Sequence, residues 1–317
     1  MTEPTGTSNI RLSNSELATF RRCKRKWWLN TYRRLKPIAG YGYNTPIHIG
    51  NVVHDALAAY YEPSLRTDPV LYAKAIFDEE LAANPAYEIE ILEEWSLVEP
   101  MLVSYIDWLE ETGADQNLRF LGSERMVEVP LYDQHVLISK LDATVEQISD
   151  GAKLALEHKT VGDLETPMHL LKIDTQLLTE HLVRYLDAQA KGSTQEEALD
   201  DCHGILYNML KKNKRTSRSR PPFFKREIIP HNAHELNNHW RHVMTVALEM
   251  DRMRNLLDLG GNHHEIVPPS PMKTCKWECE FFKVCHMFDD GSQVESALEA
   301  MYEEHDPLER YAGTEHL

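Results

Sequence analysis

The feature that most constrains the fold is a set of four cysteines divided between the two ends of the chain. Cys23 lies near the start, and Cys275, Cys279 and Cys285 form a C-x3-C-x5-C run in CKWECEFFKVC. Four thiolates are the usual ligand number of one tetrahedral metal or iron–sulfur site. With one ligand near the start of the chain and three near its end, such a site would connect the two ends of the folded protein. We therefore expect folding to bring the two ends together.

Disulfide bonds are the alternative use of these cysteines. The start of the chain, MTEPTGTSNIRL, has neither the charged nor the apolar region of a signal peptide, and a fifth cysteine, Cys202, would stay unpaired. Both points favour a metal or iron–sulfur site, with Cys202 as a bystander. No run of about 18 apolar residues occurs, which predicts a cytoplasmic protein.

Basic residues are concentrated in two short stretches of an acidic chain. The formal net charge of −16 argues against nucleic-acid binding, but residues 21–36 and 211–226 each hold eight Lys or Arg and no Asp or Glu. Such segregation can confine a polyanion to one groove, whereas solvated helix faces usually intersperse both signs. Aromatic residues in both stretches could stack on bases or pack in the core. The residues predicted to contact DNA are Arg21, Arg22, Arg25, Lys211, Lys212, Lys214, Arg215, Arg218 and Arg220.

The order of the predicted elements indicates one α/β unit. Ser13 with Glu16 has the form of a capping box and predicts a helix over residues 16–35 that carries Cys23. Further helices are expected over residues 47–62, to about Gly113, over 169–190 and from Asn232 to Asp258, with strands across 123–160 and over 204–210. We expect one integrated domain with an N-terminal helical region (1–113), a sheet core (114–230) with a basic loop (211–226), a C-terminal helix and cysteine region (231–288) and an acidic tail (289–317).

Two adjacent predicted strands carry the candidate metal ligands and a candidate catalytic lysine. In KLALEHKT the two-residue period places Glu157 and Lys159 on one face, and in the preceding strand Asp142 points away from the apolar side. A hairpin between the strands would bring both carboxylates to one Mg²⁺ or Mn²⁺ ion. His54, four residues after Gly50 on one helix face, favours Mn²⁺, and the glycine would allow close approach to the sheet. Lys159 could orient an attacking water and offset charge on a pentacovalent phosphate.

Together these motifs resemble the RecB-like branch of the PD-(D/E)XK nuclease superfamily, and its iron–sulfur members in particular, over most of residues 12–288. LSNSELATFRRC resembles the family's opening motif, although Lys24 stands where proline is common, and GNVVH matches the Gly-x3-His motif. SKLDATVE resembles the GxxD strand and LALEHKT matches the (D/E)xK strand. The resemblance implies a restriction-endonuclease-like mixed sheet flanked by helices. It also implies metal binding by His54, Asp142, Glu157 and the backbone carbonyl of His158, with Lys159 as the catalytic lysine.

Two further family features are matched less closely. The family has a Gln-x3-Tyr motif on a helix, which this chain does not match in full. Four residues after Gln176 the chain has Glu180 in place of tyrosine, and four residues before Tyr185 it has His181 in place of glutamine. We assign Gln176 as the DNA-positioning residue. The terminal triplet resembles the cluster-binding end of AddB-type nucleases, in which C-x2-C-x5-C is commoner. By that resemblance Cys23, Cys275, Cys279 and Cys285 would hold a structural [4Fe–4S] cluster.

The leading functional hypothesis is a metal-dependent DNA exonuclease or flap nuclease of recombination, repair or replication, in a bacterial or phage-infected cell and with a helicase or recombination protein as a possible partner. Hydrolysis would proceed by in-line attack of a metal-activated water on the phosphodiester. One alternative is a non-catalytic DNA-binding or assembly module, against which the retained Asp142, Glu157 and Lys159 count. Another is a zinc-stabilised adaptor, which leaves the basic stretches unexplained.

Overall fold

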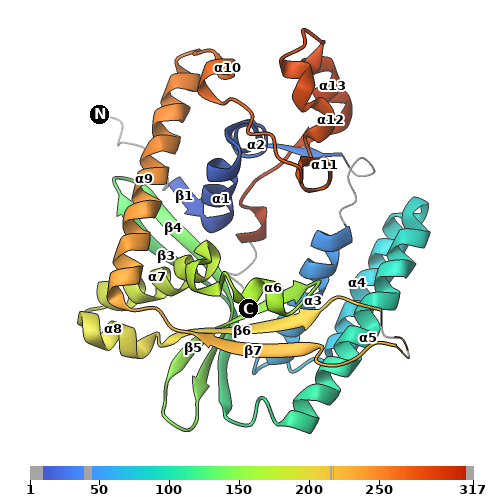
Figure 1. Cartoon of the computed structure of the whole chain (residues 1–317), viewed down its shortest axis with the longest axis vertical. Helices are drawn as coiled ribbons and strands as arrows, with labels where there is room; N and C mark the ends of the chain where they lie inside the picture. Colours follow the sequence, from blue (N-terminus) through green and yellow to red (C-terminus); the bar gives the residue numbers. More distant parts are fainter. Residues whose placement is uncertain (1–9, 39–44, 215, 217, 312–317) are drawn as a thin grey trace, which may run out of the picture. The chain divides into compact units, whose positions relative to one another are not determined.

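The computed structural model describes residues 10–38, 45–214, 216 and 218–311 (Figure 1). The chain divides into two compact units, each built from separate stretches of sequence. The first unit comprises residues 1–43, 129–138 and 237–317, and the second comprises residues 44–128 and 139–236. Within the described ranges, no helix is long and apolar enough to cross a membrane.

The second unit is built on a mixed β-sheet. β4 pairs with β3 and, antiparallel, with β5; β5 and β6 are parallel, and β6 and β7 are antiparallel. The strands expected across residues 123–160 and over 204–210 are confirmed, whereas β7 was not predicted. Their bounds are β3 (Leu118–Tyr132), β4 (His135–Gln147), β5 (Lys153–Val161), β6 (Gly204–Lys211) and β7 (Phe224–Ile229).

Helices of the second unit begin and end at local signals in the sequence. Asp68 accepts hydrogen bonds from the N–H groups of Val70 and Leu71 at the start of α4, and Asp174 caps α7 in the same way. Gly113 ends α5 in the left-handed conformation, with a φ of 64°. The helices are α3 (Thr45–Tyr61), α4 (Pro69–Ala83), α5 (Glu88–Thr112), α6 (Glu165–Met168), α7 (Thr175–Ala190) and α8 (Gln195–Asp201), with 3-10 turns at Pro85–Tyr87 and Leu171–Ile173.

Helices cover both faces of this sheet (Figure 1). The face of β5 that carries His158 and Thr160 lies against α3, where a Cβ at Gly50 would be 3.6 Å from Thr160 Oγ1. The opposite face carries Glu157 and Lys159, both of which contact Gln176 of α7. Residues 154–158 are at most 2% exposed, as expected of a central strand covered on both sides. The predicted α/β class with a mixed sheet flanked by helices is thus confirmed.

The first unit differs from the prediction at its opening helix. Ser13 Oγ accepts from the N–H of Glu16, but the Glu16 carboxylate turns inward to Trp27 and Arg254 and does not complete a capping box. The helix is broken at Cys23, whose backbone is extended (φ −156°, ψ 110°). Cys23 therefore lies in a break between α1 (Asn14–Arg22) and α2 (Lys24–Trp27), with a π-helical turn at Trp28–Tyr32.

Described segments from near the two ends of the chain pair with one another in the first unit. β2 (Leu35–Pro37) pairs antiparallel with β8 (Tyr302–Glu304), so the acidic tail contributes a short strand to this unit. β1 (Ile10–Ser13) pairs in parallel with residues 135–138 at the start of β4. The remaining elements are α9 (Ala233–Asp258), which begins in the second unit, and α10 (His263–Ile266), α11 (Cys275–Glu278), α12 (Phe282–Cys285) and α13 (Val294–Met301), with 3-10 turns at His286–Phe288 and Glu309–Tyr311.

Candidate active site

The candidate site lies in the second unit, where β4 and β5 stop pairing. The antiparallel register runs from Glu146–Lys153 to Ala143–Leu156. Continued by one position, it places Asp142 opposite Glu157, so that both carboxylates emerge where the strands separate. The alternation of buried residues along β4 agrees with the prediction, because Leu141 and Ala143 are about 1% exposed while Asp142 points the other way.

Asp142 is held by two partners. Its Oδ2 accepts a hydrogen bond of 2.8 Å from the backbone N–H of His158 and lies 3.2 Å from Nδ1 of His54. Burial alone would raise the pKa of Asp142, but the His54 imidazole outweighs it and holds that pKa well below the usual range. The Asp142 carboxylate in turn changes the pKa of the His54 imidazole. Although burial opposes its charge, the Asp142 carboxylate raises the pKa of His54 to about 9.

Glu157, Lys159 and Gln176 form the other half of the site. Gln176 Nε2 donates to Glu157 Oε1 at 2.6 Å, and Lys159 Nζ donates to Gln176 Oε1 at 2.6 Å and to Glu157 Oε1 at 3.4 Å. Burial, together with repulsion from Asp142, raises the pKa of Glu157 to about 7. Gln176 therefore joins the two residues of the (D/E)xK strand.

Glu180 is a third carboxyl group in this site. It lies one turn after Gln176 on α7, is 4% exposed and shares a side-chain hydrogen bond with Gln176. Burial and the charges of Glu157 and Asp142 raise its pKa well above the usual value. Tyr185, the other candidate on this helix, is buried and bonds to Gln189 instead. In the sequence Glu180 stands out only as a departure from the family's Gln-x3-Tyr motif, although its four-residue spacing from Gln176 places both on one helix face and was a usable signal.

The donor set fits a hard divalent cation, because it offers two carboxylates and an imidazole from three elements. Across the described residues, however, no group of three His, Cys, Asp or Glu side chains is arranged to hold a metal ion. The contacts explain this: His54 bonds to Asp142, while Lys159 and Gln176 occupy Glu157 Oε1. A cation would have to replace some of these contacts.

Gly50 was expected to allow close approach of its helix to the sheet. A Cβ atom at Gly50 would lie at an ordinary van der Waals distance from Thr160 Oγ1, so the packing of α3 on the sheet does not require a glycine there.

Comparison with known families identifies the chain. The family model of the PD-(D/E)XK nuclease superfamily matches residues 11–286. The chain belongs to the PD-(D/E)XK nuclease superfamily. Its mixed sheet flanked by helices is consistent with that fold. Nucleases of this superfamily typically use divalent metal ions, and membership implies a nucleic-acid substrate. A search of curated proteins found no match.

In this PD-(D/E)XK protein the four cysteines all lie in the first unit but do not form a closed group. Each is a free thiol, and no three His, Cys, Asp or Glu side chains in the described part of the chain are grouped to hold a metal ion. Burial and, to a smaller extent, the charge of Cys23 raise the pKa values of Cys279 and Cys285. Backbone N–H groups also approach two sulfurs, Ser270 N to Cys23 Sγ at 3.5 Å and Met272 N to Cys275 Sγ at 3.2 Å. Cys202 is buried in the second unit and donates to Ala198 O.

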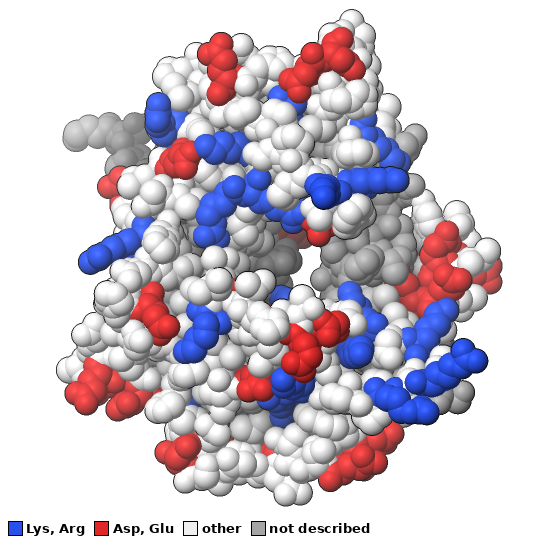
Figure 2. All heavy atoms as spheres, viewed as in Figure 1, with Lys and Arg blue, Asp and Glu red and all other residues white. Residues whose placement is uncertain are grey.

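The predicted DNA-contacting residues divide into exposed and buried ones. Arg21, Arg22, Lys214, Arg218 and Arg220 are exposed, Lys211 and Lys212 are half-buried, and Arg215 lies outside the described residues. Arg25 contradicts the prediction, because it is 1% exposed and forms a two-pronged ion pair with Asp289 at 2.6 and 3.0 Å. The aromatic residues Trp27, Trp28 and Phe224 are buried and pack in the core. The face drawn in Figure 2 carries both basic and acidic side chains.

The burial of Arg25 gives a stability prediction. Arg25→Ala should lower the free energy of unfolding by about 2–4 kcal/mol, because it removes a buried side chain together with its ion pair to the half-exposed Asp289 and leaves a cavity. The matched control is Arg22→Ala, since Arg22 is exposed and its pair with Glu278 is accessible to solvent. That change should cost about 1 kcal/mol or less. Urea denaturation of both variants checks this, and equal losses would show that Arg25 is not a structural residue.

Proposed function

We propose that this PD-(D/E)XK protein is a metal-dependent deoxyribonuclease, an exonuclease that acts on single-stranded ends or flaps in recombination, repair or replication. The observation that carries the proposal is the convergence within one unit of two groups held by contacts of 2.6–3.4 Å, His54 with Asp142 and Glu157 with Lys159 and Gln176. These residues come from the consecutive strands β4 and β5, from α7, which follows them, and from α3, which lies much earlier in the chain. A decayed, non-catalytic module would have had no reason to retain all of them.

Each residue has a distinct role in the proposed reaction. Asp142, Glu157, His54 and the His158 carbonyl would hold Mg²⁺ or Mn²⁺, which supplies a Lewis acid and a more acidic water when bound. Lys159 stays charged, because Glu157 offsets the cost of its burial and raises its pKa. Its ammonium can therefore donate to the phosphodiester as negative charge develops. Gln176 fixes the position of that ammonium through its Oε1.

The proposal that the substrate is DNA is based on the basic loop between β6 and β7. Lys214, Arg218 and Arg220 are exposed there and belong to the same unit as the site. Exposed cations on a connection next to a sheet that carries the catalytic residues can bind phosphates without specifying sequence. The preference for single strands comes from the resemblance to RecB-like enzymes.

We also propose that Cys23, Cys275, Cys279 and Cys285 hold a [4Fe–4S] cluster. The support is chemical: four free thiols lie in one unit, and two sulfurs receive backbone N–H groups, as sulfur ligands of clusters commonly do. Burial raises the pKa of Cys279 to about 11, so loading with iron would release its proton. A cluster here would stabilise the first unit and not take part in hydrolysis.

The metal site should titrate in a defined way. Both Glu157 and His54 must lose a proton to bind a cation, and their pKa values are raised to about 7 and about 9. We expect the affinity for Mn²⁺ to rise about tenfold per pH unit between pH 7 and 9, and about a hundredfold per unit below pH 7. Calorimetry in buffers of different ionisation enthalpy would count the released protons. His54→Gln should release one proton fewer than the wild type when Mn²⁺ binds. If the number of protons released is unchanged, His54 is not a ligand.

The function itself is tested by purifying the protein anaerobically and incubating it with single-stranded DNA labelled at either end. We expect Mn²⁺ or Mg²⁺ to support progressive shortening from an end and EDTA to stop it. Circular single-stranded DNA of the same length is the control, because an exonuclease leaves it intact. Absence of cleavage with every divalent metal would contradict the proposal.

A further inference from the structure

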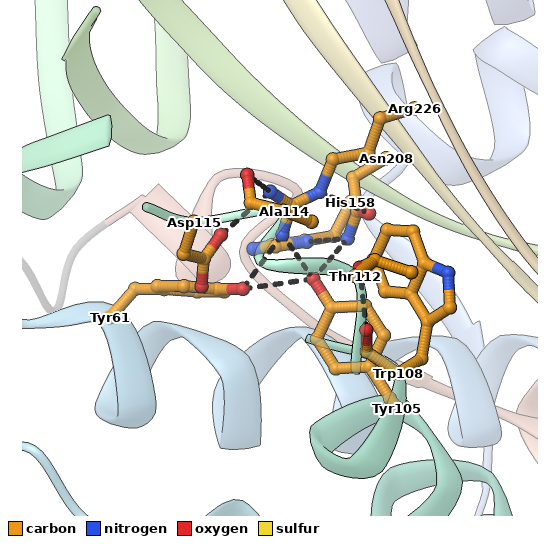
Figure 3. A network of polar contacts seen from close by, with 9 residues as sticks. All are labelled: Tyr61, Tyr105, Trp108, Thr112, Ala114, Asp115, His158, Asn208 and Arg226. Atoms are coloured by element: carbon orange, nitrogen blue, oxygen red, sulfur yellow. Dashed lines mark hydrogen bonds and ion pairs between the residues drawn. The ribbon is translucent and has the colours of Figure 1, made fainter. Parts of the chain in front are cut away.

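We infer that Arg226 and Asn208 are positioning residues of the metal site, which act by fixing the ring of His158. The inference rests on the proposed function. The starting observation is the register of three adjacent strands: His158 of β5 pairs with Asn208 of β6, and Asn208 pairs with Arg226 of β7. The three side chains therefore form a polar row across one sheet face, on the side covered by α3 and α5 (Figure 3).

Arg226 is the fixed end of this row. Although it belongs to a basic stretch of the sequence, its side chain is only 9% exposed. All of its partners are on the second unit, and Figure 3 shows them converging on the guanidinium. They are Asn208 Oδ1 at 3.0 Å, Ala114 O at 3.2 Å, Asp115 Oδ1 at 2.6 Å, Tyr61 Oη at 2.9 Å and Tyr105 Oη at 2.8 Å. With so many partners, Arg226 cannot reach a nucleic acid and serves an internal purpose.

The direction of the hydrogen bonds sets the state of His158. A guanidinium can only donate, so the Asn208 amide must turn its oxygen toward Arg226 and its nitrogen toward His158. Asn208 Nδ2 lies 2.8 Å from His158 Nδ1 and 2.9 Å from Tyr105 Oη. His158 Nδ1 must then accept, which leaves the ring neutral with its proton on Nε2. Stacking on Tyr61, at a centroid distance of 5.4 Å and an angle of 13°, holds the ring plane.

Fixing this ring also fixes the reacting residues. His158 lies between Glu157 and Lys159 on β5, and its own backbone N–H donates to Asp142. Because side chains alternate along a strand, anchoring His158 on one face orients Glu157 and Lys159 toward Gln176 on the other. Arg226 and Asn208 thus link β7 to His158 without contacting either carboxylate of the site. Neither Arg226 nor Asn208 touches the reacting atoms, so both act through His158.

The test is Asn208→Asp, which keeps the shape and the bond from Arg226 but can no longer donate to His158. The His158 ring should move its proton to Nδ1, as measured by long-range ¹H–¹⁵N NMR, whereas the wild type should show the Nε2–H tautomer. Affinity for Mn²⁺, measured by calorimetry, should fall about tenfold to a hundredfold, the usual effect of residues behind a metal ligand. The KM for DNA should stay unchanged while kcat falls.

Tyr61→Phe is the matched control, since it removes a buried partner of Arg226 but leaves the contacts of Asn208 intact. It should lower the melting temperature without changing the His158 tautomer or the affinity for Mn²⁺. If Asn208→Asp does not fold, Arg226→Lys replaces it, because a lysine can pair with Asp115 but cannot hold the Asn208 amide as well. That variant should populate both tautomers and bind Mn²⁺ more weakly.

The outcomes separate this inference from the proposed function. If Asn208→Asp binds Mn²⁺ more weakly than the wild type, and the wild type cuts no DNA, the positioning role is supported and the nuclease activity is contradicted. A switched tautomer with unchanged Mn²⁺ affinity and an unchanged cleavage rate would overturn the inference while the nuclease remains. An Nδ1–H tautomer in the wild type would overturn it as well.

Discussion

Lys159→Ala should reduce the rate of DNA cleavage by about two to three orders of magnitude, the usual loss when a donor to a developing negative charge is removed. The reason is its position: Nζ lies 2.6 Å from Gln176 Oε1 and 3.4 Å from Glu157 Oε1, beside the proposed cation. Binding of DNA and of Mn²⁺ should persist, because Lys159 ligates neither. Single-turnover cleavage of end-labelled DNA at saturating enzyme measures this effect.

Lys153→Ala is the matched control, since Lys153 lies at the start of the same strand and forms an exposed pair with Asp201. It should cleave at the wild-type rate. If Lys159→Ala also cleaves at that rate, Lys159 has no catalytic role, and the cleavage would have to come from another site or a contaminating enzyme. Loss of DNA binding in Lys159→Ala would instead make it a substrate-binding residue.

Cys23→Ser should abolish the broad visible absorption expected of the anaerobically purified protein and lower its soluble yield several-fold. Removing one of four ligands prevents stable cluster assembly, and a loss of 1–2 kcal/mol already changes abundance by that amount. Absorption spectra and iron analysis of the purified variants provide the measurement. The effect should be large, because Cys23 would be the one ligand contributed by the N-terminal part of the first unit.

Cys202→Ser is the control for this change. The Cys202 thiol is buried and donates to Ala198 O at 2.7 Å, a bond that a serine hydroxyl can also make. Its spectrum should match the wild type. An unchanged spectrum in Cys23→Ser would remove Cys23 from the ligand set, and a colourless wild type with stoichiometric zinc would replace the iron–sulfur proposal by a zinc site.

Local patterns were sufficient for most of the second unit. The strands around Asp142 and Glu157 were predictable because alternation and turn residues are short-range signals, and the turns at Asp133 and Gly151 have the positive φ expected there. The helix cap at Asn232 and Glu235 is confirmed by both of its hydrogen bonds. β7 was missed because its first residues, Phe224 to Arg226, read as part of a basic loop.

Burial of charged residues was the main feature that the sequence could not show. Arg25 and Arg226 each lie in a run of basic residues that predicts a solvent-exposed surface, yet both are buried against partners far away in the chain. Such partners, Asp289 and Asp115, become visible only once the fold brings them close. The row of His158, Asn208 and Arg226 has the same origin, since it depends on the register of three strands.

The most direct test of the account is to locate Mn²⁺ by anomalous X-ray scattering from crystals soaked in the metal. We predict a peak among His54, Asp142 and Glu157, with ligand distances of about 2.0–2.4 Å, and its loss in Asp142→Asn. No peak there at a saturating concentration, or an equal peak in Asp142→Asn, would contradict it.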